Sequence, residues 1–411
     1  MNIALIYGGR SGEHEVSINS AKDVYPPLCN LGHTVFLIAI TLEGSWFLQK
    51  TGVINHTFQT EYPLTIVPGK GIFCNEEYLP LDAAFAVTHG FGGEDGNLQG
   101  LCLLANLPLC GCDTLGSAIG MHKDIAAKLF SLEGIPTVPS QILTNQEIQW
   151  LEGRADAPPS WVSVQRETNT IDTTNSDSNR GISKKIPTKN NTQSTNHTKT
   201  DRWAEAFQVL QKKLGTSLFI KPEDSGSSLG VAALRSPDQE TFRLAVLEAK
   251  KHSDCALVQA LIEPMDELEC ALLETEDGSL IVAGPALVVD PGKKSNHFLS
   301  YAYKYTQVDS AYLQLPSSYS EKIENQIRMY AKQAFRAIGS EGYARIDFFV
   351  SEDRIYLNEI NTSPGMTSKS HFPLLMKHAG YSVEQVLQTL LDHALKRKRE
   401  ENLRTYRPPG V

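Results

Sequence analysis

The residues best suited to chemistry lie near the C-terminus, on two strand-like runs that the short turn 351–353 joins. Arg345 and Asp347 stand two positions apart on the first run, and Glu359 and Asn361 stand two apart on the second. Residues two apart in a strand point to the same face. A short turn pairs the runs antiparallel, so the four side chains are expected on one patch, with Arg345 roughly opposite Glu359.

The composition of this patch suits metal binding. Two carboxylates and a carboxamide offer the oxygen ligands that Mg²⁺ uses where it bridges nucleotide phosphates. An arginine beside them can hold a carboxylate or stabilise a developing oxyanion. The alternative is a cross-strand salt bridge on a solvated face, which is ordinary in antiparallel sheets. These four residues alone leave both interpretations open.

A second candidate is the loop that follows Lys221, with the sequence KPEDSGSSLG over 221–230. Backbone N–H groups in such a glycine- and serine-rich loop can cradle phosphates, with Lys221 as a point charge. The loop lacks the G-x-x-x-x-G-K-[ST] pattern and no helix is predicted directly after it, so it is not a P-loop. From spacing alone, a plain hairpin turn is the better explanation.

Near the N-terminus, two predicted strands are each followed by a glycine-rich turn. The turns have the sequences GGRSGEHEVS, from Gly8, and HGFGGEDG, from His89. Open α/β sheets bind ligands in the crevice beyond the carboxyl ends of their strands. There Glu13 could hold an amino group, whereas His89 taken alone is more often structural. The glycines are adjacent and not spaced as G-x-G-x-x-G, so the pattern does not favour NAD binding.

Strands and helices that alternate along the chain must position these residues, which predicts an α/β fold with a parallel sheet at the N-terminus. Pro26 and Pro27 are expected to end or bend the first helix near Tyr25. The predicted strands and helix up to residue 258 are Ile3–Tyr7, Thr34–Thr41, Ala83–Thr88, a helix over Asp124–Leu132, and then Val138–Leu143, Leu218–Lys221 and Val231–Leu234.

From residue 259 the pattern predicts two more strands, Leu268–Glu274 and Leu280–Val288, before a helix over Ser320–Ile338 with an apolar stripe. The hairpin strands Tyr343–Val350 and Arg354–Ile360 follow, and Ser382 with Gln385 forms a capping pattern for the last helix. The basic run 396–399 is predicted to be its solvated end.

A polar stretch from Glu167 to about Arg202 interrupts the alternation, and it contains almost no apolar residues. Such a stretch cannot bury enough surface to offset its ordering entropy. It is therefore predicted to be a surface insertion that leaves the fold intact. The alternative is an arm that binds a partner or regulates the protein.

The bulk composition narrows the class of protein. A chain of 411 residues is too long for a single core. A net charge of −9 argues against general binding to nucleic acid or anionic membrane. The seven cysteines include no C-x-x-C pair, and no run is apolar enough to span a bilayer. With no signal-peptide pattern at the start, reduced thiols in the cytoplasm are expected.

Taken in order, the motifs resemble those of the D-alanine–D-alanine ligases of the ATP-grasp superfamily. The resemblance runs from Asn2 to about Lys396, apart from about 145–205, and rests on seven motifs: GGRSGEHEVS, HGFGGEDG, MHK, KPEDSGSSLG, YKY, ARIDFF and NEINTSPGMTSKS. It implies three α/β domains, with the nucleotide between the second and the third. Residues 1–112 would form a substrate-binding domain. Residues 113–258 would form a central domain that contains the insertion, at about 152–202. Residues 259–411 would form a C-terminal domain with a lid loop and the metal site.

The resemblance also implies a reaction. ATP phosphorylates the carboxylate of one D-alanine, the amine of a second D-alanine attacks the acylphosphate, and D-alanyl-D-alanine, ADP and phosphate result. The dipeptide would serve peptidoglycan precursor synthesis. The resemblance further implies that the enzyme uses Mg²⁺ (or Mn²⁺), with two metal ions at the site. It also implies a homodimer in the cytoplasm that neither binds nucleic acid nor inserts into membrane.

For the reacting centre, the resemblance assigns Asp347, Glu359 and Asn361 as metal ligands. Arg345, assisted by the backbone N–H of Gly365, would stabilise the tetrahedral oxyanion.

For the substrates, the resemblance assigns Glu13 to the ammonium group of the first D-alanine, with His89 nearby. Ser370 would bind the carboxylate of the second. Glu13, Ser227 and Tyr305 would form a hydrogen-bonded triad over the site.

For the nucleotide, the resemblance assigns Lys123, Lys221 and Lys304 to the phosphates, Glu267 to the ribose, and Ser228 and Gln259 to the same site. Gln259 departs from the glutamate that relatives often have, and His371 is an unexpected residue after Ser370. The stretch Asp290–Gln307 would be the lid that excludes water.

Two alternatives to this function remain open at the level of sequence. Relatives that make the D-alanine–D-lactate ester lack or replace the tyrosine found here at Tyr305, so its presence favours an amine acceptor over a depsipeptide ligase. The other alternative is a catalytically silent nucleotide-binding scaffold whose polar insertion recruits a partner.

Overall fold

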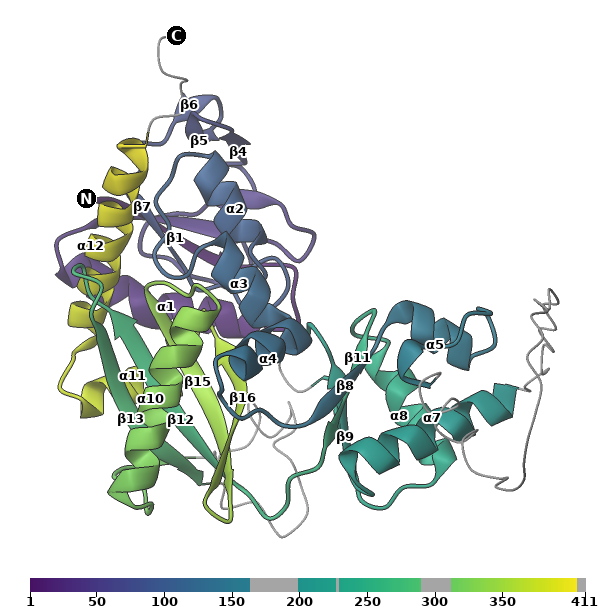
Figure 1. Cartoon of the computed structure of the whole chain (residues 1–411). Coiled ribbons are helices and arrows are strands. Elements are labelled where there is room, and N and C mark those ends of the chain that lie inside the picture. The colour runs from purple at the N-terminus through teal and green to yellow at the C-terminus, as the bar shows by residue number, and fades with distance from the viewer. Residues whose placement is uncertain (163–198, 227–228, 290–311, 405–411) are drawn as a thin grey trace, which may run out of the picture. The chain divides into compact units, whose positions relative to one another are not determined.

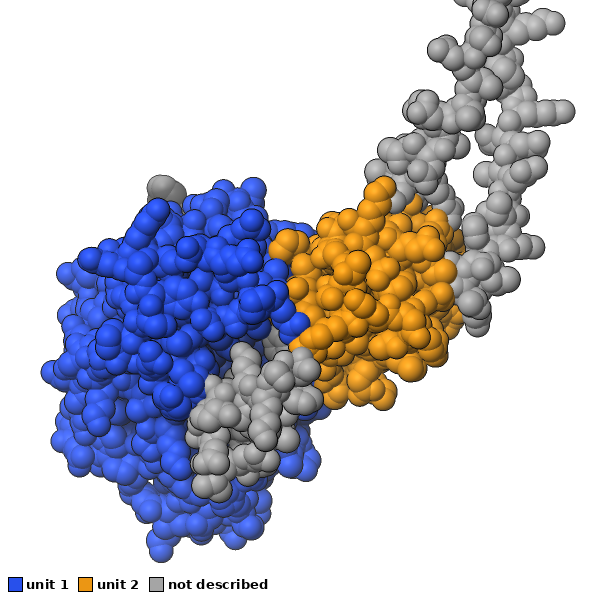
Figure 2. All heavy atoms as spheres, turned by 90° about the horizontal axis from the view of Figure 1, so that it is seen from below, with its two compact units in different colours: residues 1–138, 224–229, 262–411 blue, residues 139–223, 230–261 orange. Residues whose placement is uncertain are grey.

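The computed structural model describes residues 1–162, 199–226, 229–289 and 312–404 (Figure 1). These residues form two compact units, coloured blue and orange in Figure 2. Unit 1 comprises residues 1–138, 224–229 and 262–411, and unit 2 comprises 139–223 and 230–261. No described helix combines the length and the apolar character that a membrane span requires.

The N-terminal sheet of unit 1 has the strand order β3-β2-β1-β7. Its central strand, β1, pairs in parallel with β2 and β7, while β3 is antiparallel, so the predicted parallel α/β arrangement is confirmed. A small antiparallel sheet, β4-β5-β6, lies in the same part of the chain. The bounds of these strands are β1 Asn2–Gly8, β2 Thr34–Ile40, β3 Trp46–Leu48, β4 Leu64–Val67, β5 Gly71–Cys74, β6 Glu77–Tyr78 and β7 Ala83–Ala86.

Helix α1 (His14–Asn30) continues through Pro26 and Pro27, so of the two predicted outcomes, an end or a bend near Tyr25, the end is wrong. Proline removes backbone donors, but the helix closes again beyond it, where the amide of Leu31 donates to the carbonyl of Pro27 at 3.1 Å. The apolar stripe of α1 is buried up to Leu28. Packing of this last turn against the core outweighs the local cost of the prolines.

Five antiparallel strands form the C-terminal sheet of unit 1, in the order β14-β13-β12-β15-β16. Their bounds are β12 Asp266–Glu274, β13 Leu280–Val289, β14 Tyr312–Gln314, β15 Tyr343–Ser351 and β16 Arg354–Asn361. All the strands predicted in this region are confirmed. The helices of unit 1 besides α1 are α2 Asn97–Leu104, α3 Thr114–Met121, α4 Lys123–Leu132, α10 Glu321–Ala337, α11 His371–His378 and α12 Val383–Asn402.

Helices cover both faces of this five-stranded sheet. On one face, α10 and α4 bury residues such as Ile327, Ala331 and Phe130 against the sheet. On the other face, α11 and α12 share one core with α1 and strand β1. The predicted stripe of α10 and the capping box of Ser382 with Gln385 are both present. The N-terminal and C-terminal sheets of unit 1 therefore stabilise each other through a common core.

Strand β16 contains a bulge that decides which of its residues face the proposed site. Strands β15 and β16 pair regularly from Ser351 with Arg354 to Phe348 with Leu357, as a two-residue turn requires. The next residue, Asp347, then pairs with Glu359 and not with Asn358. The extra residue shifts the alternation, so Leu357 and Ile360, three apart, are both buried in the core. Glu359 consequently faces the same side as Asp347.

This register corrects one prediction. Arg345 lies opposite Asn361, and Asp347 lies opposite Glu359. The prediction of Arg345 opposite Glu359 was two residues out, because neither the two-residue turn nor the bulge was included. Three of the four side chains meet on one patch, because Asn361 Nδ2 donates to Asp347 Oδ2 at 3.2 Å and Arg345 donates to the same carboxylate. The fourth, Glu359, lies opposite Asp347 in the register.

Unit 2 is a four-stranded antiparallel sheet, β10-β9-β11-β8, packed against helices. Most of the predicted polar insertion lies outside the described residues. Its flanks are ordered: Val162 is fully buried, and α7 begins at Lys199. The elements of unit 2 are β8 Ser140–Leu143, α5 Asn145–Leu151, α7 Lys199–Leu214, β9 Leu218–Pro222, β10 Ala232–Leu234, α8 Gln239–Ala249 and β11 Ala256–Ala260.

The basic run near the end of α12 is not only a solvated terminus, which corrects a second prediction. The guanidinium of Arg397 donates to the carbonyls of Leu109 and Gly111, at 2.7 and 3.1 Å, and pairs with Glu341. Arg397 thereby ties the C-terminal helix to the segment between α2 and α3. All seven cysteines are described, and none of them forms a disulfide; five are buried, while Cys29 is exposed.

Glu274, at the end of β12, is a buried carboxylate with three donors around it. Arg336 donates at 2.6 Å, the Gly342 amide at 3.1 Å, and His393 Nε2 lies 3.3 Å away. Burial alone would raise the pKa of Glu274, but the hydrogen bonds from His393, Arg336 and Gly342 outweigh it and lower that pKa. The cluster joins α10, α12 and the start of β15 to the sheet.

We expect Glu274→Ala to lower the free energy of unfolding by about 2 kcal/mol, because it removes hydrogen bonds to a buried charge. The pKa of Glu274 is lower in the folded state, so its contribution is present above roughly pH 4.3 and lost as the pH falls through the folded pKa. Urea unfolding near neutral pH and in acid should therefore show the difference from wild type shrinking in acid.

The matched control for Glu274 is Glu276→Ala, whose exposed pair with Arg399 should contribute less than about 1 kcal/mol. Equal losses in the two variants, or a difference for Glu274→Ala that grows in acid, would contradict the assignment.

Candidate active site

A buried ion pair lies at the centre of the predicted patch. Arg345 Nε donates to Asp347 Oδ1 at 2.8 Å, and Nη2 donates to Oδ2 at 2.7 Å. The side chain of Asp347 is 2% exposed and that of Arg345 is 17% exposed. The alternative of a salt bridge on a solvated face is therefore wrong, because these charges are shielded from water where Coulomb interactions are strong.

Sequence reasoning missed Glu269, which lies beside this pair. Glu269 pairs with Asp347 across β12 and β15, and its Oε2 lies 3.4 Å from Arg345 Nε. The same oxygen lies 2.8 Å from Nδ1 of His371, at the start of α11. The available signal was a glutamate followed by a run of apolar residues within one predicted strand. Only the strand pairing shows which residues this glutamate contacts.

The carboxylates crowd together on this side of the sheet. Ligand atoms of Glu267, Glu269 and Asp347 lie within 4.8 Å of one another, and Glu359 is the cross-strand neighbour of Asp347. Burial raises the pKa of Asp347, and the charges of Glu269 and Glu359 raise it further, while Arg345 opposes them. Such an excess of buried carboxylate oxygens fits a divalent cation, which prefers these ligands and would balance their charge.

Arg345 keeps its positive charge in this setting. Burial acts to lower its pKa, but the charges of Asp347 and Glu269 outweigh burial and raise the pKa of Arg345 further. Its Nη1 has no hydrogen bond to any described residue. The guanidinium is thus fixed on one edge by carboxylates, and one nitrogen remains available for a ligand.

The loop after β16 holds Gly365 and Ser370 next to each other. A Cβ at Gly365 would lie 2.8 Å from Ser370 Oγ, so the backbone approaches the hydroxyl more closely than a side chain would allow. Ser370 Oγ accepts from the Thr367 amide at 3.1 Å. The Ser368 amide donates to Asp23 Oδ2 at 2.6 Å, which anchors the loop on α1.

The two N-terminal glycine-rich turns meet in unit 1. Glu13 Oε2 lies 3.3 Å from where a Cβ would stand on Gly90, and 3.5 Å from the corresponding point on Gly226. Within unit 1, Glu13 therefore lies close to Gly90, in the turn that starts at His89, and to Gly226, in the loop after Asp224.

His89 is buried beside Glu94, with Nδ1 3.4 Å from Oε1. Burial acts to lower the pKa of His89. The hydrogen bond and charge of Glu94, with smaller contributions from Glu13 and the Ser363 backbone, outweigh burial and raise it. The Ser363 contribution places His89 near the loop that begins directly after β16.

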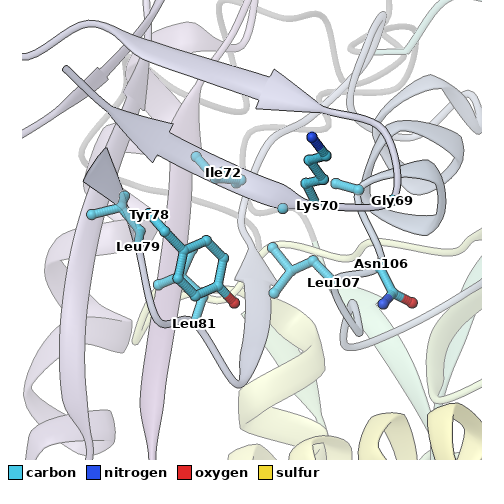
Figure 3. Close-up of a pocket in the computed structure, with 10 residues that line it drawn as sticks. Gly69, Lys70, Ile72, Tyr78, Leu79, Leu81, Asn106 and Leu107 are labelled. Atoms are coloured by element: carbon cyan, nitrogen blue, oxygen red, sulfur yellow. The ribbon is translucent and has the colours of Figure 1, made fainter. Parts of the chain in front are cut away.

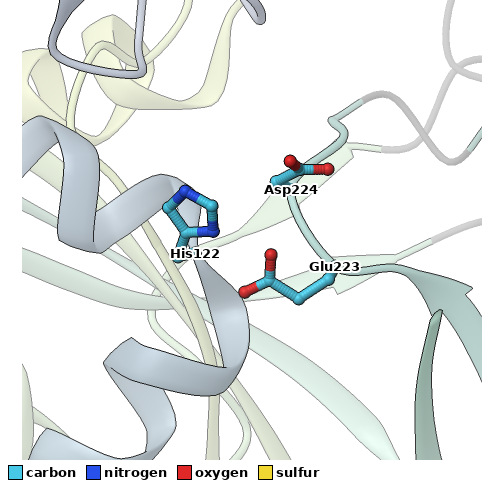
Figure 4. Close-up of side chains that lie close together, drawn as sticks. All are labelled: His122, Glu223 and Asp224. Carbon is cyan, nitrogen blue, oxygen red and sulfur yellow. The ribbon is translucent and has the colours of Figure 1, made fainter. Parts of the chain in front are cut away.

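Lys123 is the first residue of α4, and its Nζ donates to the carbonyl of Ser225 at 2.8 Å. In the same part of unit 1, ligand atoms of His122 and Asp224 lie within 4.8 Å of each other. Figure 4 draws these two with Glu223, the residue that precedes Asp224 and belongs to unit 2. Lys123 is thus held against the loop 224–226 that the sequence singled out.

Two of the predicted nucleotide residues belong to unit 2. Lys221 lies on β9, is 6% exposed, and has its Nζ 6.0 Å from the centre of the Phe219 ring. Gln259 lies on the neighbouring strand β11, where it pairs with Phe219. Within unit 2, both residues therefore come from adjacent strands. Four predicted site residues and the predicted lid lie outside the described residues: Ser227, Ser228, Lys304, Tyr305 and the stretch 290–307.

A pocket away from these residues lies against the small sheet, between β5 and the turn at 105–107 (Figure 3). Lys70, Tyr78 and Leu107 are among its lining residues, and its volume is about 70 Å³. Ligand sites usually measure about 300–1,000 Å³. This pocket is too small for a nucleotide, and the buried charges near Arg345 remain the candidate site.

Comparison with known proteins agrees with this geometry. A model of the D-ala D-ala ligase N-terminus matches residues 2–112, and a model of the D-ala D-ala ligase C-terminus matches residues 183–392. D-alanine–D-alanine ligase A of Brucella suis biovar 1 (strain 1330) is 31% identical over 409 residues, which are 97% of this chain and 98% of the relative.

Solved structures give the same result. The VanG D-Ala:D-Ser ligase from Enterococcus faecalis has a TM-score of 0.71 and 29% identity, covering 96% of this chain and 99% of that one. The D-alanine–D-alanine ligase from Coxiella burnetii has a TM-score of 0.71 and 26% identity, covering 98% and 96%. Since the family models and the relatives span nearly the whole chain, this protein belongs to the D-alanine–D-alanine ligase family and has the ATP-grasp fold.

Proposed function

We propose that this protein joins two D-alanine molecules in an ATP-dependent reaction that passes through an acylphosphate and gives D-alanyl-D-alanine, ADP and phosphate. The observation that carries the proposal is the buried cluster of Arg345 and Asp347 with Glu269, Glu359 and Asn361, in a chain of this family. A silent scaffold would not need to retain such a cluster, because burying charges costs stability.

The chemistry explains why ATP is needed. A carboxylate at neutral pH is a poor electrophile, and phosphorylation turns its oxygen into a leaving group. Asp347, Glu359 and Asn361 would hold the metal ion, and the donor set suits Mg²⁺ or Mn²⁺, with two ions expected from the resemblance. When bound, the cations neutralise charge on the phosphates during phosphoryl transfer.

Arg345 has the position and charge to stabilise the tetrahedral intermediate. Asp347 fixes its guanidinium on one edge, which leaves Nη1 to meet an oxyanion that forms when the amine attacks. The backbone N–H of Gly365 would be the second donor. Donors that are already oriented act without reorganisation at the moment of reaction, which is the usual source of large rate effects.

The remaining predicted site residues would hold the substrates and the nucleotide. Glu13, with His89 nearby, would bind the ammonium group of the first D-alanine, and Ser370 the carboxylate of the second. The position of Gly226 beside Glu13 supports the proposed triad of Glu13 with Ser227 and Tyr305. Lys123, Lys221, Lys304, Ser228, Gln259 and Glu267 would bind ATP, and 290–307 would close over it.

In this proposal the product serves peptidoglycan precursor synthesis in the cytoplasm, and the enzyme is a homodimer. Size-exclusion chromatography with light scattering gives the oligomeric state directly.

We expect release of ADP that depends on D-alanine, with formation of the dipeptide, in a coupled assay and by mass spectrometry. D-serine and D-lactate serve as competing acceptors, because the named relatives include a D-Ala:D-Ser ligase and the depsipeptide ligase is the sequence alternative. The proposal is wrong if ADP release is the same with and without D-alanine, or if product forms only with D-lactate.

We expect Arg345→Ala to lower kcat by about 100- to 1,000-fold, because its charge opposes one that develops in the transition state. Nucleotide affinity, measured by calorimetric titration, should change much less. Arg345→Lys is the control, since it keeps the charge beside Asp347 but loses the bidentate geometry. An equal fall in nucleotide affinity would show that Arg345 binds ATP instead.

We expect chelation to abolish ADP release and added Mg²⁺ or Mn²⁺ to restore it. Glu359→Gln should raise the Mg²⁺ concentration for half-maximal rate by about 10-fold or more, because a neutral amide is a poorer ligand for a hard cation. Glu352→Gln, in the exposed turn of the same hairpin, is the matched control. An unchanged Mg²⁺ requirement in Glu359→Gln would remove this residue from the metal site.

A further inference from the structure

Glu269 is a buried carboxylate that contacts an imidazole and a guanidinium from different elements. Its side chain is 4% exposed, and Oε2 lies 2.8 Å from His371 Nδ1 on α11 and 3.4 Å from Arg345 Nε on β15. Burial of an acid is tolerated when partners and hydrogen bonds compensate it. Glu269 therefore serves as the connection between the start of α11 and the guanidinium at the centre of the candidate site.

The position of His371 gives this connection a consequence for the acceptor. Ser370 is the N-cap of α11, and His371 is the first residue of the helix. Phe372, the next residue, is fully buried in the core that α11 shares with α12 and α1. The contact with Glu269 thus fixes the first turn of α11, and with it Ser370, against strand β12.

We propose that Glu269 and His371 form a positioning pair that holds the acceptor-binding Ser370 in register with Arg345. The inference rests on the proposed roles of Ser370 and Arg345. Neither member of the pair needs to touch a reacting atom. Their contribution is to fix the distance between the group that binds the second substrate and the group that stabilises the intermediate, where displacements of about 1 Å can cost 100-fold in rate.

A pair with a purely structural role would change stability without changing acceptor binding. Strand β12 contains such a pair, which can be compared with Glu269 and His371. Glu274, at the other end of β12, also pairs with a histidine, His393, with Nε2 3.3 Å from Oε2. That pair joins α12 to the sheet, and among the described residues it contacts none that is proposed for the site. His393→Ala is therefore the matched control for His371→Ala: it removes a histidine from a buried glutamate of the same strand.

The experiment compares His371→Ala, His371→Asn, Glu269→Gln and His393→Ala in the full chain. Initial rates are measured against D-alanine at saturating ATP and fitted with separate constants for donor and acceptor, and then against ATP. We expect His371→Ala to raise the acceptor KM by about 10-fold, with the ATP KM within about twofold of wild type. Asparagine can place an amide N–H near the position of Nδ1, so His371→Asn should restore most of the acceptor affinity.

The double variant of Glu269→Gln with His371→Ala tests whether the two residues act as one unit. Coupled residues give non-additive effects, so the double variant should be little worse for the acceptor than the more damaging single one. Glu269→Gln keeps the size of the side chain, and thermal unfolding and ATP titration show whether each variant is folded.

Three results would overturn the pairing. They are equal changes in the KM of acceptor and ATP in His371→Ala, no recovery in His371→Asn, and a shift in thermal unfolding alone, as expected for His393→Ala. Failure of the proposed function would be seen in a separate measurement, in which the wild-type protein releases no ADP in response to D-alanine.

Discussion

The bidentate pair of Arg345 and Asp347 is the interaction on which the arrangement of the C-terminal sheet depends. A guanidinium and a carboxylate at this depth are stable only when their remaining hydrogen-bonding groups find partners. The sheet supplies these from both neighbouring strands, with Asn361 from β16 and Glu269 from β12. The sheet is therefore organised around a charged centre as well as an apolar core.

The same requirement explains the irregular pairing of β16. A regular ladder after the two-residue turn would place Glu359 on the core side, where Leu357 and Ile360 are buried. The bulge at Asn358 lets both apolar side chains reach the core and brings the glutamate to Asp347. The resulting excess of negative charge, which Arg345 offsets only in part, is what a divalent cation would balance.

The N-terminal elements are joined to this centre within unit 1. Asp23 on α1 binds the Ser368 amide, and Arg397 on α12 binds the carbonyls of Leu109 and Gly111, between α2 and α3. A common apolar core lies beneath these contacts. The loop that carries Gly365 and Ser370 is therefore anchored on the first helix of the chain, which suits a site where two small substrates must be placed against each other.

The sequence by itself determined the strands around the site, the helices α4, α10 and α12, the α/β alternation, and the residue types of the site, but not the small sheet β4-β5-β6 or helices such as α2 and α11. Apolar periodicity, glycine-rich turns and capping residues are local signals, and they are readable without contacts. Arg345, Asp347, Glu359 and Asn361 could be grouped because they lie on two strands joined by one short turn.

Only the tertiary structure decided features that depend on residues far apart in the chain. It placed Glu269 and His371 beside Arg345, set the register through the bulge at Asn358, and carried α1 through Pro26 and Pro27. In each case the packing energy of a shared core or the compensation of a buried charge outweighs a local preference. Such terms come from pairs of segments, so no single stretch of sequence contains them.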